Sequence, residues 1–249
     1  MTIKGQVVLI TGAGSGIGRA FAVGFTKDGA RVVGFDVNKE GLAGTAQACA
    51  NRLMTVVGDV TSQADVDRLV AAVTEQFGRI DVLFNNAGIG DQGSVLERPF
   101  DDWARVIQVN LIGVALCTHR VLPGMLERGH GRIINVVSRA AESADARLSA
   151  YATSKAGVIT FTRALANGID RESYPDVLVN AMIPGTTRTA IWARALESGM
   201  LSDELLKNFQ EPEVVYPHAC FMAELPACGP NGRVFWNSEE YPIYQHFND

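Results

Sequence analysis

A tyrosine and a lysine four residues apart, Tyr151 and Lys155, are the side chains of this 249-residue chain with the clearest chemical potential. The stretch around them, SAYATSKAG, is typical of a helix, on which residues four apart share one face. A free phenol has a pKa of about 10, and lowering it to near 7 takes about 4 kcal/mol of preferential stabilisation of the anion. An ammonium group one turn away is a source of that stabilisation, so the pair indicates proton transfer at the Tyr151 oxygen.

Two more polar residues belong to the same candidate centre. Ser138 ends the apolar run GRIINVVS, which is predicted as a strand, and open α/β sheets bind ligands at the carboxyl ends of their strands. Asn110 lies in IQVNLIG, on an apolar face of a predicted helix. Each of these residues also has an ordinary interpretation, as a packing tyrosine, a solvated lysine, a turn-forming serine or a hydrogen-bonded core amide. Only the fold can bring them together.

A glycine cluster, TGAGSGIGRA at residues 11–20, directly follows the apolar run QVVLI. A loop between a strand and a helix directs backbone N–H groups and a helix N-terminus at its ligand, and such a site attracts phosphate. Gly12 permits the turn, Gly16 lets the backbone approach a pyrophosphate, and Gly18 lets helix and strand pack closely. The spacing differs from G-x-G-x-x-G, so the glycine cluster alone is also compatible with a purely structural turn.

Asp36 closes the next predicted strand, RVVGFD, twenty residues after Gly16. A carboxylate there accepts hydrogen bonds from both adenosine ribose hydroxyls and repels a 2′-phosphate. Neither Ser15 nor Val37 offers a positive charge. By itself Asp36 reads as a strand-end turn residue, but together with the glycine loop it predicts NAD(H) rather than NADP(H) as the cofactor.

The elements that position these residues form one alternating pattern. Continuous apolar runs separated by helical segments predict a parallel sheet with helices on both faces. The whole chain, 1–249, is therefore predicted to be a single doubly wound, Rossmann-type α/β domain with seven parallel strands. The predicted strands are QVVLIT, RVVGFD, LMTVVGD, IDVLFNNAG, GRIINVVS, VLVNAMIPG and GRVFWN, and the predicted helices are roughly 16–29, 38–50, 62–77, 101–128, 149–172 and 212–224.

Composition narrows the classes of partner and compartment. The net charge of −5 argues against nucleic acid or an anionic membrane as the partner. No signal peptide or membrane-spanning run is recognised, and the four scattered cysteines suit a reducing compartment, so a cytoplasmic location is expected. His218, Cys220, Cys228 and His246 match no common ligand spacing, so no metal site is predicted.

Taken together, these motifs resemble the short-chain dehydrogenase/reductase family from residue 5 to about 189. The motifs are all present in order and at the family's spacing, which makes the resemblance specific. They are TGAGSGIG at 11–18, Asp36, Asp59-Val60, NNAG at 85–88, Asn110, Ser138, the YxxxK pair Tyr151/Lys155, and PGTTRT at 184–189.

The resemblance implies a role for each residue of the centre. Tyr151 would be the acid/base, and Ser138 would hydrogen-bond the substrate oxygen. Lys155 would hold the nicotinamide ribose and favour the tyrosinate, while Asn110 would hold a water in a proton relay. Asp59 would meet the adenine amino group and Val60 would flank its ring. The predicted cofactor residues are Gly12, Ser15, Gly16, Ile17, Gly18, Asp36, Asp59, Val60, Asn86, Ala87, Gly88, Tyr151, Lys155, Pro184, Gly185, Thr187 and Thr189, and the predicted substrate residues are Ser138, Ala140, Leu148, Tyr151 and Trp192.

Beyond residue 189 the resemblance weakens. Residues from about 186 to 211 are expected to cap the substrate, with Trp192, Met200 and Phe209 either lining a pocket or lying on the surface. The end of the chain, from about 232 to 249, departs from the family and is rich in aromatic residues. We expect this tail to pack over a substrate pocket. A homo-oligomer, tetramer or dimer, is expected, although the departure puts the family's usual tetramer in doubt.

The expected function is interconversion of a small secondary alcohol and its ketone by hydride transfer with NAD(H). A dinucleotide-sensing regulator with the same fold is the alternative from another class, and a dehalogenase-like relative without the nucleotide is a second. Either would be expected to lose Ser138, Tyr151, Lys155 or the glycine loop, and the sequence retains all of them.

Overall fold

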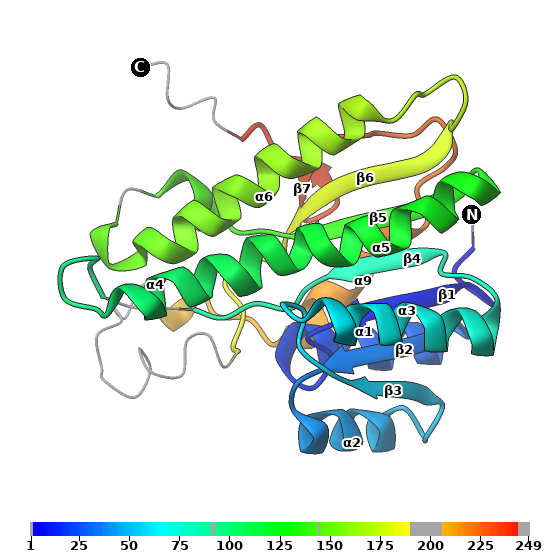
Figure 1. The fold of residues 1–249 in the computed structure, drawn as a ribbon, viewed down its shortest axis with the longest axis horizontal. Coiled ribbons are helices and arrows are strands. Elements are labelled where there is room, and N and C mark those ends of the chain that lie inside the picture. The colour runs from blue at the N-terminus through cyan, green and yellow to red at the C-terminus, as the bar shows by residue number, and fades with distance from the viewer. Residues whose placement is uncertain (1, 91–92, 144, 190–205, 244–249) are drawn as a thin grey trace.

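One eight-stranded sheet forms the centre of the computed structural model, which describes residues 2–90, 93–143, 145–189 and 206–243 (Figure 1). The strand order is β3-β2-β1-β4-β5-β6-β7-β8. Strands β1 to β7 pair in parallel, and β8 runs antiparallel to β7. The strands are β1 Val7–Thr11, β2 Arg31–Asp36, β3 Leu53–Val57, β4 Val82–Asn85, β5 His130–Val136, β6 Asp176–Ile183, β7 Val234–Trp236 and β8 Glu239–Glu240.

The seven predicted parallel strands are confirmed, but the predicted strand number is wrong by one. Strand β8 is only two exposed glutamates, joined to β7 through Asn237 and Ser238, both at positive φ. So short and polar a strand carries no hydrophobic pattern that a sequence could reveal. It turns the chain back beside β7 at the end of the sheet.

Helices cover both faces of the sheet because its central strands are apolar on both sides. All five residues of β1, VVLIT, are buried between β2 and β4. One face packs on a core that includes Phe21, Phe25 and Phe84, and the other on a core that includes Leu69 and Met125. The first face carries α1 Gly16–Lys27, α2 Lys39–Ala48 and α9 Tyr216–Ala223, and the second carries α3 Gln63–Phe77, α5 Gly113–Arg128 and α6 Ser149–Gly168.

The predicted helix 101–128 contains a π-helical turn that no sequence pattern predicts. Helix α4 covers Phe100–Ile107, a π-helical turn covers Gln108–Ile112, and α5 follows without a break. By length and composition alone, the helical stretch Phe100–Arg128 would suffice to cross a membrane. An 18-residue window within it has a mean hydropathy of 1.3, and 44% of that window is buried inside the protein. Such π turns occur frequently at functional sites, and this one holds Asn110.

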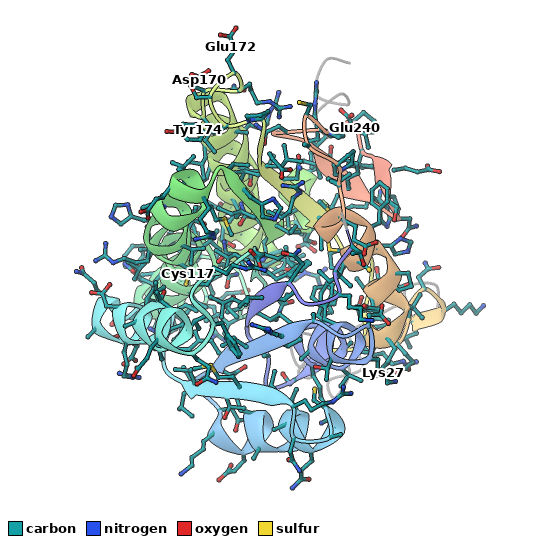
Figure 2. All side chains as sticks on the ribbon, turned by 90° about the vertical axis from the view of Figure 1, so that its right-hand side faces the viewer. Lys27, Cys117, Asp170, Glu172, Tyr174 and Glu240 are labelled. Atoms are coloured by element: carbon teal, nitrogen blue, oxygen red, sulfur yellow. The ribbon has the colours of Figure 1, made fainter. Side chains whose placement is uncertain are left out.

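The connections set which end of the sheet can hold a site. Helix α6 ends at Gly168, earlier than the predicted 172, and the chain then turns through Asp170 and Tyr174 to the start of β6 (Figure 2). That turn lies at the amino end of β6. The residues that sequence reasoning singled out lie in segments that follow the carboxyl ends of β1, β2, β4, β5 and β6, at the opposite end of the strands.

The described cysteines form no disulfide, and the described His, Cys, Asp and Glu side chains form no metal-binding cluster. All four cysteines are free, and Cys117 lies buried on α5 (Figure 2). Within the described ranges, no group of three or more His, Cys, Asp or Glu side chains is arranged to hold a metal ion.

A buried polar chain ties the second helical layer to the sheet. Asn85 Nδ2 on β4 donates to Thr118 Oγ1 on α5, at 2.9 Å, and to Asn135 Oδ1 on β5, at 2.8 Å. Asn135 Nδ2 donates in turn to Thr162 Oγ1 on α6, at 2.9 Å. All four side chains are at most 2% exposed, so their polar atoms depend on one another.

Removing the central member of this chain should destabilise the fold. Asn135→Ala removes one hydrogen-bond partner each from Asn85 Nδ2 and Thr162 Oγ1, although the Thr162 hydroxyl still donates to the Val158 carbonyl. We expect the free energy of unfolding to fall by about 2 kcal/mol. Urea titration followed by circular dichroism measures this change. The exposed Gln76→Ala on α3 is the control, expected within about 0.5 kcal/mol of the parent. Equal stability of the Asn135 variant would contradict the role assigned to the chain.

Candidate active site

The glycine loop is packed so tightly that side chains cannot enter it. Gly12 and Gly16 have φ of +70° and +49°, in the region that favours glycine. A Cβ on Gly18 would lie 2.1 Å from the Gly12 carbonyl oxygen, and a Cβ on Gly12 would lie 2.8 Å from the Ala87 Cα. The backbone amides of Gly12 and Ala13 both donate to the Phe35 carbonyl. The loop therefore holds its shape through backbone contacts and presents the N-terminus of α1.

The Thr11 hydroxyl joins the ends of β1 and β4 beneath this loop. It donates to the Phe84 carbonyl and accepts from the amides of Asn86 and Ala87, both at 3.0 Å. Asn86 Nδ2 returns the contact by donating to the carbonyls of Thr11 and Gly12. Asn86 thus has a structural role within NNAG, whereas the contribution of Thr11 was missed because a threonine ending a strand is unremarkable in sequence.

Asp36 and Asp59 are both held in place by hydrogen bonds. The Asp36 oxygens accept from the amides of Gly14 and Asn38, each at 2.8 Å. Asp59 accepts from Thr61 and from the Arg105 guanidinium, also at 2.8 Å. Partial burial raises the pKa of Asp59, but the Arg105 and Thr61 hydrogen bonds outweigh it and hold that pKa below its usual value. Asp59 is therefore charged near neutral pH, and hydrogen bonds fix the positions of both carboxylates.

These residues line one cavity of about 270 Å³ that reaches from Asp36 to Tyr151 and Lys155. Of the predicted cofactor residues, Gly18, Gly185 and Thr187 do not line it: Gly18 packs against the Gly12 carbonyl, while Gly185 and Thr187 line the second cavity described below. The lining residues are Gly12, Ser15, Gly16, Ile17, Phe35, Asp36, Val37, Gly58, Asp59, Val60, Asn86, Ala87, Gly88, Ile89, Arg105, Val109, Val136, Val137, Tyr151, Lys155, Pro184 and Thr189.

Tyr151 and Lys155 lie together on α6, as their spacing predicts. The Lys155 ammonium is 5.6 Å from the centre of the Tyr151 ring and donates to the Val136 carbonyl at 2.9 Å. Lys155 is only 3% exposed, and this burial lowers its pKa to about 8. Burial raises the pKa of Tyr151 to about 12, with the hydrogen bond to Ser138 acting in the opposite direction.

In the protein alone, burial outweighs any lowering of the Tyr151 pKa by Lys155, and a more acidic phenol beside both Lys155 and a positive nicotinamide ring stays a prediction. The physical reason is desolvation, which penalises the phenolate and the ammonium alike and drives both groups toward their neutral forms. Tyr151 keeps partial exposure toward the cavity. A positive charge brought next to the phenol from outside the chain would act against this burial effect.

Asn110 is fully buried, and its amide clamps a neighbouring loop. Its Oδ1 accepts from the Ile89 amide at 2.8 Å, and its Nδ2 donates to the Ile89 carbonyl and to Ser154 Oγ. A Cβ on Gly88 would lie 3.3 Å from Asn110 Oδ1 and 3.7 Å from Lys155 Nζ. Both N–H donors of Asn110 are used in these contacts, which fits the core-amide interpretation and places Gly88 between Asn110 and Lys155.

A second cavity, of about 120 Å³, shares Tyr151 with the first and includes Ser138. The Ser138 hydroxyl accepts from the Ala140 amide at 3.1 Å, which fixes its position. Of the predicted substrate residues, Ala140 and Leu148 line neither cavity, and Trp192 lies outside the described residues, as does Met200. The lining residues are Ile17, Val137, Ser138, Arg139, Tyr151, Ile183, Pro184, Gly185, Thr186, Thr187, Thr189 and Trp236.

The model of one protein family, short chain dehydrogenase, matches residues 6–198. This span includes the glycine loop, Asp36, Asn110, Ser138, Tyr151 and Lys155. The chain belongs to the short-chain dehydrogenase family. Membership makes it an oxidoreductase.

Curated relatives of this dehydrogenase cover nearly its full length. A (2S)-[(R)-hydroxy(phenyl)methyl]succinyl-CoA dehydrogenase subunit from Thauera aromatica is 36% identical over 95% of this chain and 96% of its own. A meso-2,3-butanediol dehydrogenase from Serratia marcescens is 35% identical over 93% of this chain and 92% of its own.

Solved structures give the same result for the fold and the cofactor class. A 3-ketoacyl-(acyl-carrier-protein) reductase from Brucella melitensis, complexed with NADH, superposes with a TM-score of 0.86 at 29% identity over 95% of this chain and 98% of that one. An actinorhodin polyketide ketoreductase with NADPH gives 0.85 at 32% identity over 94% and 95%. A nicotinamide dinucleotide is thus the cofactor class.

The residues of this dehydrogenase fit such a cofactor. The cavity begins at the bare backbone of Gly12 and Gly16, the N-terminus of α1 at that point is suited to bind an anion, and the cavity continues to Lys155. Sequence reasoning missed Arg105 and Val109, which come from α4 and the π turn and have no motif of their own, and Arg139, which directly follows Ser138. Adjacency to Ser138 was the only signal for Arg139.

Burial of Lys155 should leave a signature in the pH dependence of stability. Its pKa is about 8 in the folded protein against the ordinary 10.5, so between these values the unfolded chain binds more protons than the native one. The free energy of unfolding should therefore rise with pH across that window, by roughly 3 kcal/mol.

Lys155→Met removes this dependence, and urea titrations from pH 7 to pH 10.5 (approximate limits set by the two pKa values) measure it. The stability of wild type minus that of the variant is expected to increase steadily over the window. The exposed Lys27→Met on α1 is the matched control and should run parallel to wild type. Parallel curves for both variants would show that Lys155 keeps its ordinary pKa.

Proposed function

We propose that this dehydrogenase interconverts a secondary alcohol and the corresponding ketone with NAD(H), using Tyr151, Ser138 and Lys155. The observation that carries the proposal is that Tyr151 lies in the lining of both cavities. One cavity runs from the glycine loop and Asp36, and the other contains Ser138. A proton donor at the junction of a dinucleotide cavity and a small-ligand cavity is what carbonyl reduction requires.

The described residues support a division of labour. When bound, a nicotinamide dinucleotide supplies the hydride acceptor or donor. Ser138 Oγ, fixed by the Ala140 amide, is placed to donate a hydrogen bond to the substrate oxygen. Tyr151 gives its proton to that oxygen in reduction and takes one in oxidation. Lys155, anchored on the Val136 carbonyl, orients the ribose and keeps a positive charge beside the phenol.

NAD(H) is proposed over NADP(H) because of Asp36. Its carboxylate is fixed by two backbone amides at the end of the cavity. There it can accept hydrogen bonds from the ribose hydroxyls and would repel a 2′-phosphate. Arg105 and Lys155 are the cations among the described lining residues. Arg105 is hydrogen-bonded to Asp59, and Lys155 lies at the Tyr151 end.

An alcohol or ketone substrate is supported by the catalytic groups and by the relatives. A butanediol dehydrogenase among the relatives acts on a small secondary alcohol, as its name states. A dinucleotide-sensing regulator would have no use for Ser138 and Tyr151 in a second cavity, with Lys155 beside Tyr151 in the first. We therefore favour the enzyme.

Tyr151→Phe tests the proton donor. Loss of the phenolic oxygen should lower kcat by roughly 10²- to 10⁴-fold, with binding of NAD⁺ little changed. The measurement is the absorbance of reduced nicotinamide during oxidation of a panel of secondary alcohols. Tyr174→Phe, in the turn at the far end of the sheet, is the control and should keep wild-type rates. Substantial turnover by the Tyr151 variant would remove Tyr151 from the mechanism.

Asp36→Asn tests the choice of cofactor while keeping the side chain's shape and one oxygen for the Gly14 amide. Losing the charge should lower the ratio of kcat/KM for NAD⁺ to that for NADP⁺ by roughly 10-fold or more. Asp59→Asn, a second carboxylate in the same cavity, should leave the ratio near that of wild type. An unchanged ratio in the Asp36 variant would show that another residue decides between the cofactors.

A further inference from the structure

The cavity beside Ser138 and Tyr151 has a positive charge in its described lining and no negative one. Among the described residues that line it, Arg139 carries the one formal charge, and the others are apolar, glycine, proline, hydroxyl-bearing or aromatic. A ligand that brings no negative group into this space would face a guanidinium without a matching partner. Sites built around a charged group discriminate strongly against ligands that leave it unpaired.

Arg139 is held in place by an aromatic platform. Its guanidinium carbon is 4.9 Å from the centre of the Trp236 ring, a cation–π contact. This contact restrains the guanidinium, which carries five N–H donors and so can bind a further acceptor. Arg139 also begins the short 3-10 helix Arg139–Glu142, so its backbone is continuous with Ser138.

The platform is itself supported by the end of the chain. Tyr241 packs edge-on against Trp236, with ring centres 5.6 Å apart. The Tyr241 hydroxyl donates to Glu142 Oε2 at 2.9 Å and also lies within hydrogen-bonding reach of Arg139. Glu142 is therefore engaged by Tyr241 and is not part of the cavity lining. Trp236, the last residue of β7, thus forms part of the cavity wall, and Tyr241, which directly follows β8 in the chain, supports it.

We propose that Arg139, seated on Trp236, is a specificity-determining residue that binds a carboxylate on the substrate, so that the enzyme acts on short hydroxy acids or oxo acids. The hydroxyl or carbonyl oxygen lies at Ser138 and Tyr151, and the carboxylate at Arg139. A planar guanidinium matches a carboxylate in geometry as well as in charge. Ser138 and Arg139 are neighbours in the lining of one small cavity, so a substrate whose two polar groups are separated by few carbons could reach both. This inference rests on the proposed function.

The test compares an acid with its own neutral ester. Wild-type enzyme is assayed with racemic 3-hydroxybutanoate and 3-hydroxypentanoate and with their methyl esters, which differ from the acids in charge. Arg139→Gln should lower kcat/KM for the acids by roughly 10- to 100-fold, mainly through KM, and change it for the esters by less than about threefold. Arg139→Lys should recover part of the loss, and Trp236→Leu should lie between wild type and Arg139→Gln.

Arg147→Gln is the matched control. Arg147 lies in the same loop, pairs with Asp145 and does not line the cavity, so acid and ester rates should both stay near wild type. Thermal unfolding of each variant checks that it is folded. Equal losses for acid and ester in Arg139→Gln, or a wild type that prefers the esters, would overturn the inference.

A binding measurement separates this inference from the proposed function. Calorimetric titration of 3-hydroxybutanoate into the protein with NADH present needs no turnover, and Arg139→Gln should weaken binding by the same 10- to 100-fold (approximate) factor. Tyr151-dependent oxidation of neutral alcohols without any Arg139 effect would leave the function standing and refute the inference. Arg139-dependent binding of the acid without turnover of any alcohol would support the carboxylate site at Arg139 and refute the proposed function. Binding of neither acid nor ester refutes the inference.

Discussion

The site depends on how closely the ends of β1 and β4 approach each other. The Thr11 hydroxyl satisfies one carbonyl and two amides at that junction, and Asn86 closes it from the other side. Because the two backbones are in contact there, no side chain fits at Gly12 or Gly18. The bare backbone that results is the floor of the larger cavity. The bare start of the glycine loop and the position of Ala87 both follow from this one contact.

Burial has two effects at the catalytic pair. It disfavours charge on both Tyr151 and Lys155, which leaves a phenol and an easily deprotonated amine in the absence of other charges. The same burial means that any charge introduced nearby acts strongly, since little water screens it. The pKa of Tyr151 is therefore expected to respond to any charged group that enters the two cavities.

Sequence reasoning reached the parallel sheet, the glycine loop and the Tyr151/Lys155 pair because each has a local signal. Period, apolar continuity and motif spacing do not depend on distant parts of the chain. The failures are of the opposite kind. Strand β8 and the π turn at Asn110 have no pattern of their own, and Arg139 becomes interesting only once Trp236, almost a hundred residues later, is seen beneath it. The pKa of Tyr151 could not be judged from spacing, because desolvation depends on everything packed around it.

The π turn at Gln108–Ile112 bears on how an extra residue is accommodated in this helix during evolution. A π turn accommodates one residue more than an α-helical turn would, so deletion of a single residue there would let the strain-free α geometry return. Because the π turn takes up the extra residue within a single turn, α4 and α5 keep their phase across it. The same extra residue in a regular α-helix would rotate one part by about 100° relative to the other, which is the angle between consecutive α-helical residues. The π turn therefore holds Asn110 against Ile89 while Arg105 stays in the cavity wall.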